Sequence, residues 1–117
     1  MSMRIKNETR GKPLAGQARE ARSTGERMKG LLGRDGMEEG EGLYITPCTS
    51  IHSFFMRFVF DAIFVDKNGI VLHLIPSMKK WRMSKWVPRA AGVIELPAGT
   101  IEQSGTQKGD RVVMEVV

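Results

Sequence analysis

The chain has 117 residues, of which 41% are hydrophobic and 26% are charged, and its formal net charge is +5. This length and composition suit one globular domain with a continuous core and argue against global disorder. One cysteine and two histidines exclude an internal disulfide and a Cys₂His₂ or Cys₄ zinc site.

The N-terminal part of the chain predicts a polar segment followed by a short helix. Residues 1–12 are mostly polar, so we expect a flexible segment, or at best an edge strand, ahead of a single domain over residues 13–117. Ser23 and Glu26 form the S-x-x-E pattern of a capping box. The spacing of the following apolar residues predicts a helix of about three turns with Gly30 in its interior.

The centre of the chain predicts a β-hairpin. Two apolar runs, FVFDAIFV and IVLHLI, flank an Asn68-Gly69 dipeptide, the signature of a type I′ turn. The cross-strand pairs that follow are Asp66–Val71, Val65–Leu72, Phe64–His73, Ile63–Leu74 and Ala62–Ile75. Both faces of this hairpin are apolar, which indicates that both are covered. We expect His73 to be a packed histidine rather than a functional one.

Short strands are also expected at residues 42–46, 92–97 and 111–117, with a helical turn between the last two. About six strands with one or two short helices define the predicted fold class. It is α+β and predominantly β, a small barrel-like antiparallel or mixed sheet.

Three polar side chains of the central region are candidate catalytic groups. Cys48 and His52 are four residues apart, and a thiolate paired with an imidazole is a nucleophile. The alternative is that Cys48 packs as a small hydrophobic residue beside Pro47. Asp61 lies in an apolar run, where it either ties down a bend as a structural carboxylate or acts as an acid or base. In the catalytic alternative, Arg57 would hold an anionic substrate.

The segment 76–91 has five basic residues, no acidic residue and two tryptophans. The candidate ligand-binding residues in it are Lys79, Lys80, Trp81, Arg82 and Trp86. Cations and flat rings suit nucleic acid, an anionic membrane surface or an acidic protein. The alternative is a long loop in which Trp81 and Trp86 fill the core while the lysines stay in water.

Three blocks of sequence, RMKGLLGRDGMEEGEGLYI, SIHSFFMRFVFDAIFVDKNGIV and GVIELPAGTIEQSGTQKGDRV, carry a G-L-x-G-R helix end, an F-x-M-x block before D-x-x-F-x-D, and a closing G-D. Together they resemble the uncharacterised prokaryotic family DUF192 over roughly residues 15–117. The resemblance implies a compact α+β fold with a barrel-like sheet, and no particular reaction. The residues that match its polar pattern are Arg34, Arg57, Asp61, Asp66 and Asp110.

These observations give a leading hypothesis and an alternative. The first is a small cytoplasmic, monomeric binding or accessory domain, with no metal site and no cofactor, that uses residues 79–89 to bind nucleic acid or another anionic partner. The alternative is a small enzyme acting on an anionic substrate in a pocket near Cys48, His52, Arg57 and Asp61. The N-terminus lacks a signal-peptide pattern, and no run has the roughly 18 apolar residues of a membrane span.

Overall fold

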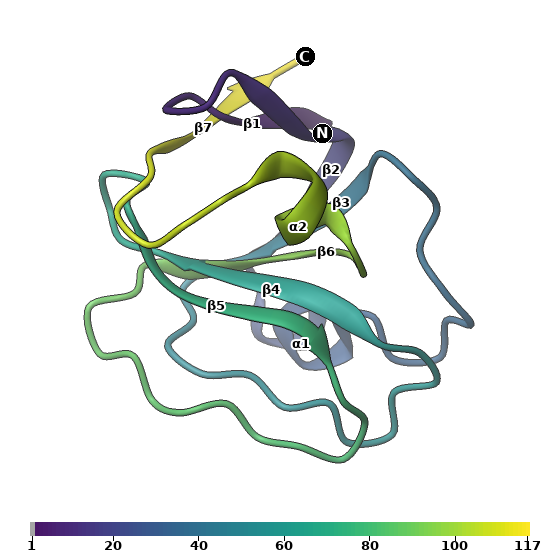
Figure 1. The fold of residues 1–117 in the computed structure, drawn as a ribbon. Helices are drawn as coiled ribbons and strands as arrows, with labels where there is room; N and C mark the ends of the chain where they lie inside the picture. The colour runs from purple at the N-terminus through teal and green to yellow at the C-terminus, as the bar shows by residue number, and fades with distance from the viewer. Residues whose placement is uncertain (1) are drawn as a thin grey trace.

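A seven-stranded β-sheet curls into half a barrel in the computed structural model, which describes residues 2–117 (Figure 1). The strands are β1 (Met3–Asn7), β2 (Lys12–Ala21), β3 (Glu41–Ile45), β4 (Phe60–Val65), β5 (Val71–Met78), β6 (Gly92–Pro97) and β7 (Val112–Val116). The helices are α1 (Thr24–Lys29) and α2 (Thr100–Ser104). The predicted class, α+β with a predominant barrel-like sheet, is confirmed.

The strand order is β5-β4-β6-β3-β2-β1-β7. In the described part of the chain, β2 and β3 pair in parallel and the other neighbouring strands are antiparallel, so the sheet is mixed. The strands at 42–46, 92–97 and 111–117 were expected. Strand β2, ten residues long, was not, because its pattern of small and polar residues does not alternate cleanly.

The N-terminal segment contains an interior strand. β1 pairs with β2 on one side and with β7 on the other, so the structure places Met3–Asn7 inside the sheet rather than at its edge or outside the domain. Met3, Ile5 and Asn7 are buried at alternate positions, while the residues between them are exposed. The many charges in residues 1–12 hide this two-residue period, which is why composition alone misses the strand.

The hairpin of β4 and β5 is confirmed in position and largely in register. Three of the five predicted pairs are present, namely Phe64–His73, Ile63–Leu74 and Ala62–Ile75. The predicted pairs Val65–Leu72 and Asp66–Val71 are wrong, because the register shifts by one residue beyond Phe64 and Val65 faces Val71. The His73 ring packs 5.3 Å from the ring of Phe64, as expected for a packed histidine.

The shift originates in the turn, which is not type I′. Gly69 has a positive φ of 82°, but Asn68 does not, whereas a type I′ turn needs both. The Gly69 N–H donates to the Asp66 carbonyl at 3.0 Å, and Asp66 Oδ1 accepts from the N–H groups of Asn68 and Ile70. This is a type I turn followed by a glycine bulge, and the extra residue moves the register.

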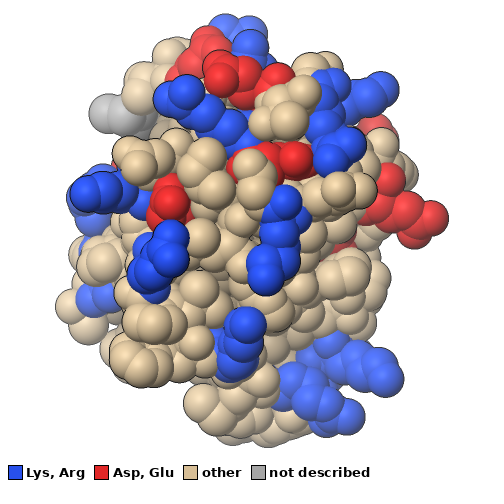
Figure 2. Space-filling view, turned by 60° about the vertical axis from the view of Figure 1, so that its left-hand side comes forward, with Lys and Arg blue, Asp and Glu red and all other residues tan. Residues whose placement is uncertain are grey.

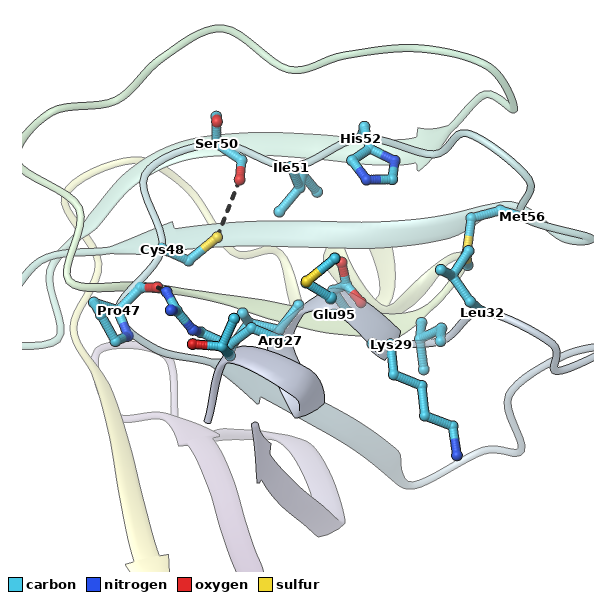
Figure 3. A pocket seen from close by; sticks show the side chains of 15 residues that line it. Arg27, Lys29, Leu32, Pro47, Cys48, Ser50, Ile51, His52, Met56 and Glu95 are labelled. Carbon is cyan, nitrogen blue, oxygen red and sulfur yellow. Dashed lines mark hydrogen bonds between the residues drawn. The ribbon is translucent and has the colours of Figure 1, made fainter. Parts of the chain in front are cut away.

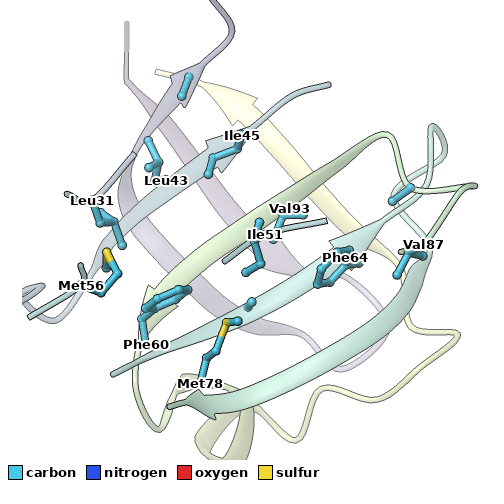
Figure 4. Packing of buried hydrophobic residues seen from close by; sticks show 13 residues of the cluster. Leu31, Leu43, Ile45, Ile51, Met56, Phe60, Phe64, Met78, Val87 and Val93 are labelled. Atoms are coloured by element: carbon cyan, nitrogen blue, oxygen red, sulfur yellow. The ribbon is translucent and has the colours of Figure 1, made fainter. Parts of the chain in front are cut away.

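Both faces of β4 are covered, as predicted, and every residue of the strand is buried. One face contributes Phe60, Ala62 and Phe64 to a core that the loops after β3 and β5 cover (Figure 4). We call this the loop-side core. The other face contributes Ile63 and Val65 to a core that includes Ile101 of α2, which we call the α2-side core.

Helix α1 begins as predicted but is shorter. Ser23 Oγ accepts from the Glu26 N–H, and Glu26 Oε1 accepts from the Ser23 N–H, each at 3.1 Å, so the capping box is confirmed. The expected three turns are wrong, because Gly30 takes a positive φ of 45° and ends the helix after Lys29. Within residues 2–117, neither helix is long and apolar enough to cross a membrane.

Candidate functional site

A pocket of about 320 Å³ opens on the loop-side core, between α1 and the segment that follows β3 (Figure 3). This volume lies at the lower end of the range for small-molecule sites. Its apolar lining includes Leu31, Leu32, Ile45, Ile51 and Met56. Its charged and titratable lining residues are Arg27, Lys29, Cys48, His52 and Glu95.

Cys48 and His52 both line this pocket, but their hydrogen bonds do not join them. The Cys48 thiol donates to the Ser50 carbonyl at 3.1 Å, and burial raises the pKa of the thiol. His52 is exposed, and its Nδ1 accepts from the Phe54 N–H at 3.2 Å. A thiol whose pKa is raised, and whose hydrogen bond goes to a carbonyl, is a poor nucleophile at neutral pH. The geometry therefore does not favour a thiolate–imidazole pair.

Asp61 lies away from the pocket, on the opposite face of β4. It is fully buried, and its two carboxylate oxygens accept from the N–H groups of Ser77 at 2.7 Å and Ile101 at 2.8 Å. These bonds tie the end of β5 and the first turn of α2 to the centre of the sheet. The arrangement matches the structural-carboxylate interpretation, in which Asp61 holds a bend.

Arg57 is also absent from the pocket. Its Nη1 donates to Asp35 Oδ1 at 3.0 Å in an exposed ion pair. Of the four residues expected to share one pocket, the structure brings together Cys48 and His52 and leaves out Arg57 and Asp61. Asp61 is left out because successive side chains of β4 point to opposite faces of the sheet, and that of Asp61 points toward the α2-side core.

Glu95 is a pocket residue that the sequence reasoning missed. It sits in the middle of β6, opposite Leu43 of β3 and Ala62 of β4, and only 5% of its surface is exposed. Burial raises the pKa of its carboxyl to about 8. The sequence did contain a signal for Glu95. An acidic residue between Ile94 and Leu96 of a predicted strand is as unusual as Asp61 in the apolar run of the hairpin.

The segment after β5, together with Phe55 from the segment after β3, forms a second candidate site, which we call the aromatic–basic surface. Its exposed apolar residues are Phe55, Trp81, Met83 and Trp86, with exposed fractions of 71%, 54%, 69% and 70%. Its basic residues, all exposed, are Lys79, Lys80, Arg82, Lys85 and Arg89. The alternative in which Trp81 and Trp86 fill the core is therefore wrong. In Figure 2, the lower part of the visible face, at the height of these loops in Figure 1, shows Lys and Arg without Asp or Glu.

The aromatic rings of this surface are ordered by contacts with one another. His52 stacks on Phe54 with ring centroids 5.1 Å apart, and Phe54 stacks on Trp81 at 6.1 Å. Phe55 meets Trp81 edge-on at 4.8 Å. The rings thus form a partly exposed row that runs from the edge of the pocket onto the aromatic–basic surface.

A buried serine joins the two loops that carry these rings. Ser53 Oγ accepts from the Arg82 N–H at 2.9 Å and donates to the Lys79 carbonyl. The Ser53 N–H donates to the Arg82 carbonyl at 2.8 Å, and the Trp81 N–H donates to the Ser53 carbonyl at 3.2 Å. The surface is therefore built on a fixed backbone rather than on two independent loops.

A half-barrel sheet with a loop-side pocket and an adjoining aromatic–basic surface defines a small, predominantly β domain. Residues 5–114 match the model of the family DUF192, described as "Uncharacterized ACR", and the chain belongs to this family. It is 31% identical to a UPF0127 protein of Thermococcus sibiricus, over 94% of this chain and 73% of that protein. It is 32% identical to one of Pyrococcus furiosus, over 91% of this chain and 93% of that protein.

Two solved structures share the fold. One is a protein of unknown function from Novosphingobium aromaticivorans, with a TM-score of 0.82 at 18% identity over 97% of this chain and 84% of that one. The other, described as a putative transcription regulator, is from Sinorhizobium meliloti, with a TM-score of 0.80 at 21% identity over 97% and 92%. At these identities the likeness shows the fold alone.

The residues that carry the family resemblance act mostly in turns and ion pairs. Arg34 pairs with Glu41 at 2.9 Å, and Asp66 closes the hairpin turn. Asp110 accepts from Arg10 Nε at 2.6 Å and from the Gln107 N–H at 2.9 Å. Hydrogen bonds from Arg10 lower the pKa of Asp110 to about 2. In this chain these side chains stabilise the fold, and none of them lines the pocket.

Proposed function

We propose that this chain is a monomeric, cytoplasmic binding domain whose aromatic–basic surface binds single-stranded nucleic acid. The observation that carries the proposal is the exposure of two tryptophans among five basic side chains, in a segment without acidic residues. Single strands offer what this pattern complements. Their bases present flat faces for stacking, and their phosphates present negative charge.

The backbone beneath the rings supports a binding role. Phe55 and Trp81, which contact each other, have positive φ angles of 66° and 62°. Such angles cost a bulky residue about 1–3 kcal/mol each and are concentrated at functional sites. Here they hold two large apolar rings in water, where the rings gain little free energy from packing. A partner that covers the rings would supply this free energy.

The aromatic and the basic side chains of this surface contact different parts of the strand. Bases stack on the rings of Trp81 and Trp86, each stack contributing about 1–3 kcal/mol. Lys80 and Arg82, which flank Trp81 in sequence, contact the phosphates on either side. The five basic residues of this segment, which has no acidic residue, steer the anionic strand toward this face.

The experiment is a titration of a fluorescent 15-nucleotide single strand, DNA or RNA, followed by anisotropy. We expect the double variant Lys80→Glu, Arg82→Glu to abolish binding and Trp81→Ala to weaken it about tenfold. The matched control, Arg4→Glu with Lys6→Glu, reverses two exposed charges on β1 and leaves binding within about twofold. Binding that the first pair does not affect would refute the proposal.

Vesicles containing anionic phospholipid provide the competing test, because exposed tryptophan and lysine also suit a membrane interface. We expect the oligonucleotide to bind more tightly than these vesicles under the same salt conditions. Tight vesicle binding that depends on Trp81 and Trp86, without oligonucleotide binding, would assign the surface to lipid and overturn the proposal.

A further inference from the structure

The pocket holds a buried carboxyl group that the aromatic–basic surface does not use. Glu95 reaches the pocket from β6, and Figure 3 shows it on the inner wall. No hydrogen bond or ion pair joins its carboxyl to another side chain or to the backbone in residues 2–117, and burial alone shifts its pKa. Unpartnered carboxyl groups in apolar surroundings are costly, so an unpaired one that faces a cavity points to a ligand.

The protonation state of Glu95 determines what it can bind. Because burial raises the pKa of this carboxyl to about 8, the group is mostly neutral at pH 7. A neutral carboxyl both donates and accepts a hydrogen bond. It can therefore lie beside an anion without repulsion, as an ionised glutamate cannot.

The other titratable groups around the pocket are three basic side chains and one thiol. Arg27 and Lys29 come from α1, and His52 and the neutral thiol of Cys48 come from the segment after β3. Arg27 Nη1 donates to the Pro47 carbonyl at 2.9 Å, but the Arg27 Nε–H is buried without a partner among the described residues. A buried N–H without a partner costs free energy, and an acceptor on a ligand would recover it when the Arg27 side chain turns toward the pocket.

We propose that this pocket binds the carboxylate of a small apolar acid. The carboxylate accepts a hydrogen bond from the carboxyl O–H of Glu95 and, once the Arg27 side chain turns toward the pocket, from the Arg27 Nε–H. The hydrocarbon part of the acid packs against Leu31, Ile51 and Met56 on the apolar wall. Both polar groups that lack partners are then satisfied, and the ligand's charge meets a cation.

The charge of the lining decides between an acid and an amine. A cationic amine could pair with ionised Glu95, but it would enter beside Arg27 and Lys29. Among residues 2–117, Glu95 is the only acidic residue that lines the pocket. The basic side chains outnumber it, so the field at the entrance attracts anions and repels cations.

The test is calorimetric titration of the purified chain with hexanoate, butanoate and hexylamine at pH 7, and with inorganic phosphate as a purely anionic probe. We expect hexanoate to bind more tightly than butanoate, by up to about fourfold for each added methylene. We expect hexylamine and phosphate to bind more weakly than hexanoate. Hexylamine binding more tightly than hexanoate, or no saturable binding of either acid, would overturn the proposal.

Variants separate the two polar contacts. Arg27→Gln should weaken hexanoate binding at least tenfold and Arg27→Lys less, whereas Arg4→Gln, an exposed control on β1, should leave it unchanged. Circular dichroism confirms that each variant is folded. Affinity that Arg27→Gln leaves unaltered would contradict the proposed contact.

The pH profile tests the role of Glu95. In the wild type, hexanoate affinity should fall about tenfold from pH 7 to pH 9 as the Glu95 carboxyl ionises. Glu95→Gln keeps a hydrogen-bond donor without a charge, so it should retain binding within about threefold at pH 7. This variant should also lose most of the pH dependence. The other titratable groups of the lining are the same in both proteins, so equal profiles for the two would refute the proton's role.

Discussion

Replacing Glu95 by glutamine is expected to change how the stability of the fold depends on pH. The carboxyl has an ordinary pKa of 4.5, and burial raises it to about 8 in the folded chain. Between these values the folded state keeps a proton that the unfolded state releases. The favourable contribution of neutral Glu95 is therefore fully present below pH 4.5 and is lost as the pH rises toward 8.

The size of this effect follows from the shift. Each pH unit in that window removes about 1.4 kcal/mol of stability, so roughly 3 kcal/mol is lost by pH 7. Glutamine carries no charge in either state and removes the dependence. We therefore expect the wild type to lose stability relative to Glu95→Gln by about 1 kcal/mol per unit between pH 5 and pH 8.

Urea unfolding of both proteins at pH 5, 6, 7 and 8 measures this difference directly. Glu102→Gln, an exposed substitution on α2, is the matched control and should run parallel to the wild type. Other titrating groups, such as Asp110, are unchanged in every protein and cancel in the comparison. A gap between wild type and Glu95→Gln that stays constant with pH would show that Glu95 is not held neutral by burial.

Two further predictions concern the other candidate residues. Asp61→Ala leaves the buried N–H of Ile101 without an acceptor and removes the bond to the part-buried N–H of Ser77, and we expect it to reduce the free energy of unfolding by about 2–4 kcal/mol in urea titrations. A loss below 1 kcal/mol would contradict the structural role. Because burial raises the pKa of the Cys48 thiol, alkylation by iodoacetamide should be slow at pH 7.5 and accelerate only above pH 9. Rapid reaction at pH 7 would revive the nucleophile hypothesis.

The sequence predicted those parts of the fold that rest on local signals. The capping box at Ser23, the hairpin of β4 and β5 and the short C-terminal strands each depend on residues close together in the chain. The turn at Asn68-Gly69 was placed correctly but assigned the wrong type, because the Asp66 side chain accepts two backbone N–H groups and selects a different turn. β1 was missed because one of its two partners, β7, lies at the other end of the chain.

The candidate sites show the same limit. Cys48 and His52 were grouped correctly because they are near in sequence, but Arg57 and Asp61 were added to them by proximity along the chain alone. Glu95 reaches the same pocket from a strand more than forty residues away. Only the pairing of β6 between β3 and β4 brings it there, and that pairing is a property of the whole sheet.

The exposure of the tryptophans also could not be read from the sequence. A loop with alternating basic and aromatic residues can bury its rings or display them. The choice depends on Ser53, which fixes the loop to its neighbour and leaves Trp81 outside. Because both tryptophan rings are exposed, they are available to a partner together with the basic side chains.

The decisive measurement is the salt dependence of single-strand binding by the wild-type chain. If the five basic residues of the aromatic–basic surface neutralise phosphates, a plot of log K against log salt concentration should have a slope of about −3.5. The Lys80→Glu, Arg82→Glu variant should bind too weakly to give a slope, and the Arg4→Glu, Lys6→Glu control should retain it. A slope near zero, or equal slopes in all three proteins, would contradict nucleic-acid binding through this surface.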